Sequence, residues 1–153
     1  MSNIKDVWIY ANNIIRSSRQ MVNEGLNPLN LSSAEGNILL HLFAQNQEVG
    51  QEDIVEQLDL SKPAISRALE SLEKKGYLTR YKASFDRRAS RVVLTDKAQE
   101  IRPMVEFVYN RVYLTAAQGI SEEEVQFFIN LFRRVSENFS NALSTPKSRR
   151  GLE

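Results

Sequence analysis

The stretch that decides the fold is residues 51–78, QEDIVEQLDLSKPAISRALESLEKKGYL. Its apolar residues fall into two groups, each spaced by three or four positions as on one face of a helix. The first group is Ile54, Val55 and Leu58, and the second is Ile65, Leu69 and Leu72. Residues 59–60 separate the groups. The stretch therefore predicts a helix-turn-helix, in which a short helix over 51–58 is followed by a tight turn and a longer helix.

Local signals set both ends of the second helix. Ser61 is a predicted N-cap, because its hydroxyl can accept a hydrogen bond from a free amide of the first turn. Pro63 lies in that first turn, where its missing amide hydrogen costs nothing. Gly76 is well placed to end the helix in the left-handed conformation. Lys74 and Lys75, near this end, either complement the helix dipole or contact phosphate.

The residues after Gly76 change from helical to strand character. Residues 77–81 and 91–95 are predicted strands on either side of a polar, charged tip, which is the pattern of a β-hairpin. A hairpin that directly follows a helix-turn-helix forms the wing of a winged helix. The polar residues 46–50, which precede the helix-turn-helix, are predicted to be a loop.

Long amphipathic helices are predicted on both sides of this lobe. Apolar residues at helical spacing indicate a helix over 4–24, a near-heptad pattern covers 98–116, and a further apolar stripe covers 125–143. Ser32-x-x-Glu35 and Ser121-x-x-Glu124 are predicted capping boxes that begin helices. The apolar stripes of the long helices are larger than one small lobe can bury, so a symmetric partner is expected to cover them.

Charge differs sharply between two neighbouring segments. Residues 61–97 contain ten Lys and Arg against four Asp and Glu, a net charge of +6, whereas residues 30–60 contain six acidic residues and no Lys or Arg. A basic block over a predicted helix-turn-helix and wing suits a phosphate backbone. On charge alone, a solvated basic surface is an equal alternative.

The second helix of the motif carries the residues that we expect to contact bases. In a helix-turn-helix this helix presents its polar face to the major groove. Lys62 and Arg67 can contact guanine or phosphate, and Ser66 can bond to either. Ala64 is small enough to permit close approach. The predicted DNA-contacting residues of this region are Gln51, Lys62, Pro63, Ala64, Ser66 and Arg67.

Three motifs resemble the MarR (multiple antibiotic resistance regulator) family. Residues 51–67 look like its helix-turn-helix, and residues 69–78 look like its passage from recognition helix to wing. Asp86-Arg87-Arg88, followed by Val93-Leu94-Thr95, resembles its wing signature. The resemblance covers nearly the whole chain. One departure is Gly50-Gln51, where relatives often have a threonine-like cap.

The resemblance implies a homodimer that binds a pseudo-palindromic operator in double-stranded DNA, as a repressor released by a small aromatic or amphipathic effector. Arg88 is implied to enter the minor groove, and Asp86 is implied to hold it in place, since narrow grooves attract arginine. Arg87 is a further predicted wing contact. The alternative for both arginines is a solvated loop tip.

The fold class predicted from these features is mainly α with a small β-hairpin wing: a winged helix-turn-helix with long N- and C-terminal dimerisation helices. The predicted organisation is an N-terminal dimerisation helix over 1–29, a DNA-binding lobe over 30–95, C-terminal dimerisation helices over 96–145 and a disordered tail over 146–153. The residues that we expect a dimer to bury are Val105, Val108, Val112, Phe128, Phe132 and Phe139.

Aromatic residues of the long helices, together with the one histidine, suggest an effector pocket. The candidates are Trp8, Tyr10, His41 and Phe107, although aromatics at helical spacing are also typical of a core or a dimer interface. His41 lies between two leucines, away from any other metal-ligating residue, which indicates a structural histidine. We expect neither a metal site nor a cofactor.

Composition argues against catalysis and export. The 153 residues include no cysteine, one histidine and no glycine-rich phosphate loop, which leaves little material for a catalytic site. Residues 1–6 lack the pattern of a secretory signal, and no apolar run is long enough to span a bilayer, so we expect a cytoplasmic protein. Two alternatives stay open: a winged helix that binds proteins and not DNA, and an enzyme with an unrecognised site.

Overall fold

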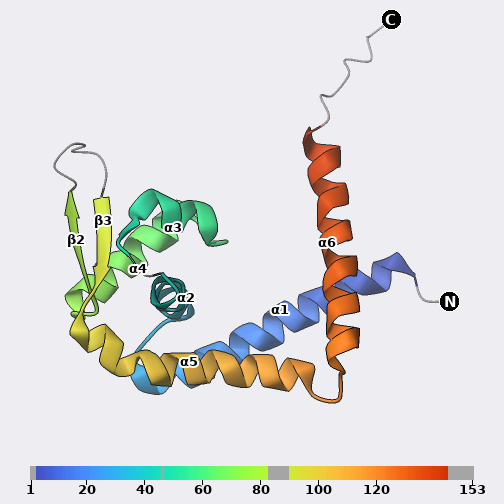
Figure 1. Cartoon of the computed structure of the whole chain (residues 1–153), viewed down its shortest axis with the longest axis horizontal. Coiled ribbons are helices and arrows are strands. Elements are labelled where there is room, and N and C mark those ends of the chain that lie inside the picture. Colours follow the sequence, from blue (N-terminus) through green and yellow to red (C-terminus); the bar gives the residue numbers. More distant parts are fainter. Residues whose placement is uncertain (1–2, 46, 83–89, 145–153) are drawn as a thin grey trace, which may run out of the picture. The chain divides into compact units, whose positions relative to one another are not determined.

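The computed structural model describes residues 3–45, 47–82 and 90–144. It contains two compact units, residues 1–113 and 114–153, so that the boundary falls within the fifth α-helix. Figure 1 shows the elements along the chain. They are α1 (Ile4–Leu26), the 3₁₀ turn η1 (Asn27–Leu29), α2 (Ser33–Phe43), β1 (Val49–Gly50), α3 (Gln51–Gln57), α4 (Lys62–Lys74), β2 (Leu78–Lys82), β3 (Ser90–Leu94), α5 (Asp96–Ala117) and α6 (Glu122–Ser144).

The predicted fold class is confirmed, because a mainly helical chain carries a small antiparallel sheet directly after the helix-turn-helix α3–α4. The two hairpin strands lie within one residue of their predicted positions. They pair in register from Leu78 with Leu94 to Lys82 with Ser90. Figure 1 shows this hairpin, β2 and β3, beside α4.

The expectation of a loop over 46–50 is wrong at its end. Val49 and Gly50 form the short strand β1, which pairs with Val92 and Arg91 of β3 and makes the strand order β1-β3-β2. Two residues cannot show an alternating pattern, so this strand exists because of its partner and not because of its own sequence. The pairing joins the wing to the start of α3 and leaves Val92 almost fully buried.

The core of the first unit lies where α2, α4 and the sheet meet the beginning of α5. Ile38, Leu39, Ile54, Ile65, Leu69, Leu72, Leu78, Val92 and Ala98 are all at most 1% exposed. The apolar stripes of both helices of the motif therefore face inward as their spacing predicts. The opposite face of α4 is consequently available to solvent.

Helix α1 packs closely against α5 within the first unit. A Cβ atom on Gly25 would lie 2.6 Å from Cγ1 of Val108, so only glycine permits this approach. At the other end of α1, Asn3 caps the helix and Asp6 returns the hydrogen bond, a capping box. The contact with α1 buries part of the apolar stripe of α5, one of the stripes that we expect a second chain to cover.

The predicted dimer-buried residues accordingly divide into two groups. Val105, Val108 and Val112 are already buried within one chain. Phe128, Phe132 and Phe139 of α6 are 51%, 40% and 50% exposed. The burial of the valines does not depend on a partner, because α1 approaches α5 at Gly25, a contact that the spacing of α5 does not reveal. Within the described residues, no helix has both the length and the apolar character needed to cross a membrane.

Candidate nucleic-acid interface

The N-terminal half of α4 is capped as predicted and presents polar side chains to solvent. Ser61 has extended backbone angles, and its Oγ accepts a hydrogen bond from the amide of Ala64 at 3.3 Å. Lys62, Pro63 and Arg67 are exposed, while Ala64 and Ser66 are half-buried. The inward stripe fixes which way the helix faces, so these five residues lie on or beside its solvent face.

Lys62 forms an ion pair with Glu52 of α3, with 3.5 Å between Nζ and Oε1. Both side chains are about two-thirds exposed, 66% and 70%, so the pair contributes little to stability. Gln51 is the first residue of α3 and is half-buried. Gly50 is the N-cap of α3 and provides no side-chain hydrogen bond, which agrees with the departure seen in the sequence.

The C-terminal end of α4 ends in the predicted glycine turn. Gly76 has a φ of +81°, in the left-handed region where a residue with a Cβ atom is strained. The amide of Tyr77 donates to the carbonyl of Leu72 at 2.9 Å, and that of Gly76 donates to Glu73 at 3.0 Å. These two bonds form a Schellman motif, which satisfies carbonyls that the helix would otherwise leave free.

Of the two predicted capping boxes, one is complete and one is half present. Ser121 and Glu124 exchange both hydrogen bonds at the start of α6. Ser32 accepts from the amide of Glu35, but the Glu35 carboxylate points elsewhere. It accepts from Ser71 Oγ at 2.8 Å and from Lys75 Nζ at 2.7 Å, both near the end of α4. Glu35 therefore links α2 to α4 and does not complete the capping box, because the fold places Lys75 beside its carboxylate.

The base of the wing is joined to its surroundings by two side-chain contacts. Arg80 of β2 donates to Glu73 of α4 from its backbone amide at 3.1 Å and from its guanidinium at 3.3 Å. The hydrogen bond from Arg80 lowers the pKa of the Glu73 carboxyl. Tyr81 donates a hydrogen bond to Glu48, which raises the pKa of the Tyr81 phenol. The predicted contacts Asp86, Arg87 and Arg88 lie outside the described residues.

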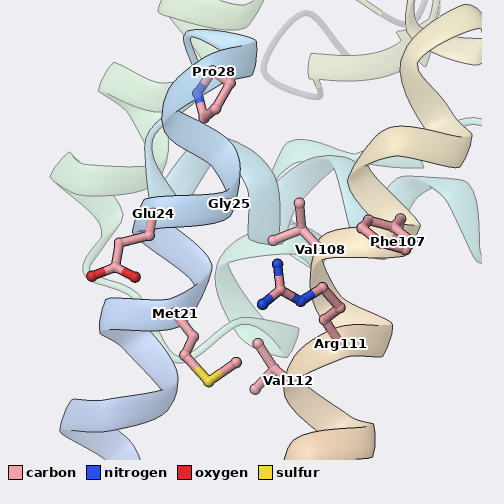
Figure 2. A pocket seen from close by; sticks show the side chains of 8 residues that line it. All are labelled: Met21, Glu24, Gly25, Pro28, Phe107, Val108, Arg111 and Val112. Atoms are coloured by element: carbon pink, nitrogen blue, oxygen red, sulfur yellow. The ribbon is translucent and has the colours of Figure 1, made fainter.

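A cleft of about 310 Å³ lies between α1 and α5. Its lining residues are Met21, Glu24, Gly25, Pro28, Phe107, Val108, Arg111 and Val112. Figure 2 shows Arg111 reaching from α5 towards the space between the helices, whereas the carboxylate of Glu24 points away from α5. The cleft therefore combines an apolar floor with a cationic side chain.

The four candidate effector residues are not all brought to this cleft. Phe107 lines it and is 63% exposed, whereas Trp8, Tyr10 and His41 are not among its lining residues. Trp8 and Tyr10 are exposed on the first half of α1. The Nε2 atom of His41 is buried without a hydrogen-bond partner in the described part of the chain. Across that same part, no three His, Asp or Glu side chains gather as a metal site would require.

The capped helix α4, its bracing helix α3 and the hairpin beside them define a winged helix-turn-helix protein. Residues 29–89 match the model of the MarR family. This segment is therefore similar to the MarR family domain, and most of the chain has the fold of MarR.

Solved structures show the same fold over most of the chain. A crystal structure of MarR is 25% identical, with a TM-score of 0.71, and the match covers 88% of this chain and 98% of that one. The structure of MepR from S. aureus in complex with DNA is 24% identical, with a TM-score of 0.77 and coverage of 90% and 99%. A putative MarR family regulator from Listeria monocytogenes, complexed with a 26mer DNA, is 23% identical, with a TM-score of 0.77 and full coverage of both chains.

Proposed function

We propose that the protein is a homodimeric, sequence-specific DNA-binding regulator of transcription. The observation that carries the proposal is the two-sided character of α4, whose apolar stripe is buried while its capped N-terminal half is exposed. A helix of this kind, braced by another helix and followed by a wing, suits insertion into the major groove. The DNA complexes of MepR and of the Listeria regulator support the same use of the fold.

Each predicted contact has a proposed role. Arg67 and Lys62 bond to guanine edges or phosphates, and Ser66 bonds to a base edge. Pro63 and Ala64 allow the helix end to approach the groove closely, and Gln51 contacts the backbone from α3. In the wing, Arg88 enters the minor groove, Asp86 orients it and Arg87 adds a phosphate contact. Binding of Lys62 to DNA would replace its ion pair with Glu52.

Homodimerisation is the second part of the proposal. Each of the two units exposes apolar side chains that a second copy would cover: the aromatic side chains of α6 in one, and Ile14 and Ile15 of α1 in the other. Two-fold symmetry then requires a pseudo-palindromic operator, with half-sites about one helical turn apart. Light scattering at micromolar concentration should show a dimer, and a stable monomer would contradict this part.

The third part is repression that a small amphipathic effector releases. The cleft between α1 and α5 combines an apolar floor with Arg111, and the same α5 starts at the wing. A ligand seated there is placed to act on the lobe through α5. An effector should lower operator affinity in the wild type and lose that effect in Phe107→Ala. Equal release of both proteins would exclude the cleft as the effector site.

The decisive experiment is selection of bound fragments from genomic DNA by the purified protein, followed by mobility shifts of the selected sites at several salt concentrations. The proposal predicts enrichment of an inverted repeat, with affinity that falls steeply as salt rises because bound counterions are released. Arg67→Ala should bind the selected site more weakly, while Arg134→Ala in α6 is the matched control. No enrichment, or equal binding by both variants, would favour a protein-binding winged helix. The expected place of action is the cytoplasm.

A further inference from the structure

Glu35 stands out because it is the only charged residue among the buried residues that the structure describes, with 5% exposure. It belongs to the first turn of α2, and its carboxylate faces the last turn of α4. Each of its oxygens has a partner, since Oε1 accepts from Ser71 at 2.8 Å and Oε2 accepts from Lys75 at 2.7 Å. The Lys75 side chain is itself only 27% exposed.

Further contacts converge on the same end of α4. Lys75 Nζ also donates to the carbonyl of Asn30, in the turn before α2, at 2.7 Å. Lys97 Nζ donates to the carbonyl of Lys75, and Thr95 Oγ1 donates to that of Gly76, both at 2.6 Å. The end of α4 is therefore bonded to α2, to the preceding turn and to the start of α5.

A buried ion pair is a poor source of stability. The cost of removing two charges from water largely offsets their attraction, so replacing both with uncharged side chains of similar size is often neutral or stabilising. Removing one partner alone leaves an uncompensated buried charge and is strongly destabilising. Such a pair does orient the two segments that it joins, because the donors must lie at the two oxygens of the carboxylate to form hydrogen bonds.

We propose that Glu35 and Lys75 are positioning residues for DNA recognition: their largely buried pair holds the C-terminal end of α4 on α2 and so sets the angle at which the N-terminal end meets the major groove. The inference rests on the proposed DNA-binding function and deepens it. It assigns specificity to residues at the opposite end of the helix from the base contacts. Neither residue touches DNA in this account.

The test compares Glu35→Gln/Lys75→Met with the wild type and with the single variant Lys75→Met. The double variant should melt within about 4 °C of the wild type, whereas Lys75→Met should melt about 10 °C lower. The affinity of the double variant for the selected operator should nevertheless fall about tenfold or more, with a smaller loss on unrelated DNA. The matched control is Arg133→Met/Glu137→Gln, which removes the exposed ion pair of α6 and should change neither quantity.

Amide hydrogen exchange of the free protein tests, without DNA, whether the pair holds the C-terminal end of α4 in place. The amides of Gly76 and Tyr77, which close the Schellman motif, should exchange about tenfold faster in the double variant although its global stability is retained. If the wild type selected no DNA, the proposed function would fail, while the exchange measurement would still decide whether the pair positions the C-terminal end of α4. Failure of the double variant to fold would count against the proposal in the same way as a low melting temperature, because the pair would then act on stability.

Three results would overturn the proposal. The first is operator affinity and specificity in the double variant equal to those of the wild type. The second is unchanged exchange at Gly76 and Tyr77. The third is a melting temperature of the double variant as low as that of Lys75→Met, because the pair would then act on stability and not on position.

Discussion

The two ends of α4 differ in nearly every physical respect. At the C-terminal end, the helix closes on the left-handed Gly76, and the side chains of Glu35, Thr95 and Lys97 form hydrogen bonds with residues 75 and 76. At the N-terminal end, the serine cap is a local contact, and the ion pair of Lys62 with Glu52 is exposed to solvent. The C-terminal end, which we call the fixed end, is held by contacts with other elements of the fold. The N-terminal end, which we call the available end, keeps its polar side chains exposed and able to contact DNA.

This difference shows how a small domain can combine rigidity with access. A helix that contacts bases must expose polar groups at its leading end, and exposed groups contribute little to stability. Stability and orientation must then come from the inward stripe and from the trailing end. The comparison predicts that substitutions at the C-terminal end act on folding and orientation, whereas those at the N-terminal end act on DNA binding alone.

The largest effect is expected from removing core packing at the fixed end. Leu72 is fully buried and also provides the carbonyl that accepts from Tyr77. Leu72→Ala should lower the free energy of unfolding by about 2–5 kcal/mol, because it leaves a cavity. Lys62→Ala, at the available end, should change it by less than about 0.5 kcal/mol. Urea denaturation of both variants measures the contrast, and equal values would remove the distinction between the ends.

The next effect concerns DNA affinity at the available end. Arg67→Ala should weaken operator binding by about 1–3 kcal/mol, through loss of a base or phosphate contact. Its melting temperature should stay at the wild-type value, since the side chain is exposed. Fluorescence anisotropy with labelled operator gives the affinity. If Arg67→Ala bound the operator normally but unfolded at a lower temperature, Arg67 would stabilise the fold and would not contact DNA.

The glycine that ends α4 gives a smaller effect, and the chain offers a matched control for it. Gly76 and Gly119 have φ values of +81° and +74°. An added Cβ would meet only ordinary contacts with Lys97 at Gly76 and nothing within 4 Å at Gly119. Each change to alanine should therefore cost about 1–2 kcal/mol of stability, from backbone strain alone. A much larger loss at Gly76 would show that its neighbours cannot accommodate the methyl group.

The smallest effect is expected from the exposed ion pair. Glu52→Gln should strengthen operator binding by less than about fivefold, because Lys62 is released from a pair worth at most about 1 kcal/mol. The gain should shrink as salt rises, since exposed charges are screened. Titrations at low and high salt measure both. A loss of affinity would mean that Glu52 helps to place Lys62 and does not compete for it.

The sequence predicted the parts of this fold that depend on local pattern. The stripe of Ile65, Leu69 and Leu72, the cap at Ser61 and the turn at Gly76 each follow from side-chain chemistry within a few residues. The strand β1 and the close approach at Gly25 did not, because both depend on partners more than 40 residues away.

The same limit applies to the candidate site. The solvent-facing residues of α4 follow from the position of its apolar stripe, so their exposure was predictable. Glu35 was missed as a partner of Lys75, because an acid in the first turn of a helix has a sufficient local explanation in capping. To predict this pair from the sequence, one would have to match Glu35 with a lysine 40 positions later, and no local pattern connects the two residues.

One measurement tests most directly whether the available end of α4 contacts bases. Affinities of the wild type, Ser66→Ala and Lys62→Ala are measured over all single-base variants of the selected operator, with Arg88→Ala for comparison. The account predicts that each α4 variant changes base preference at one position in each half-site, because the major groove distinguishes every base pair. Arg88→Ala should weaken all sites by similar factors and lower the salt dependence. If the α4 variants shifted every operator sequence equally, this helix would hold phosphate, and the central claim would be contradicted.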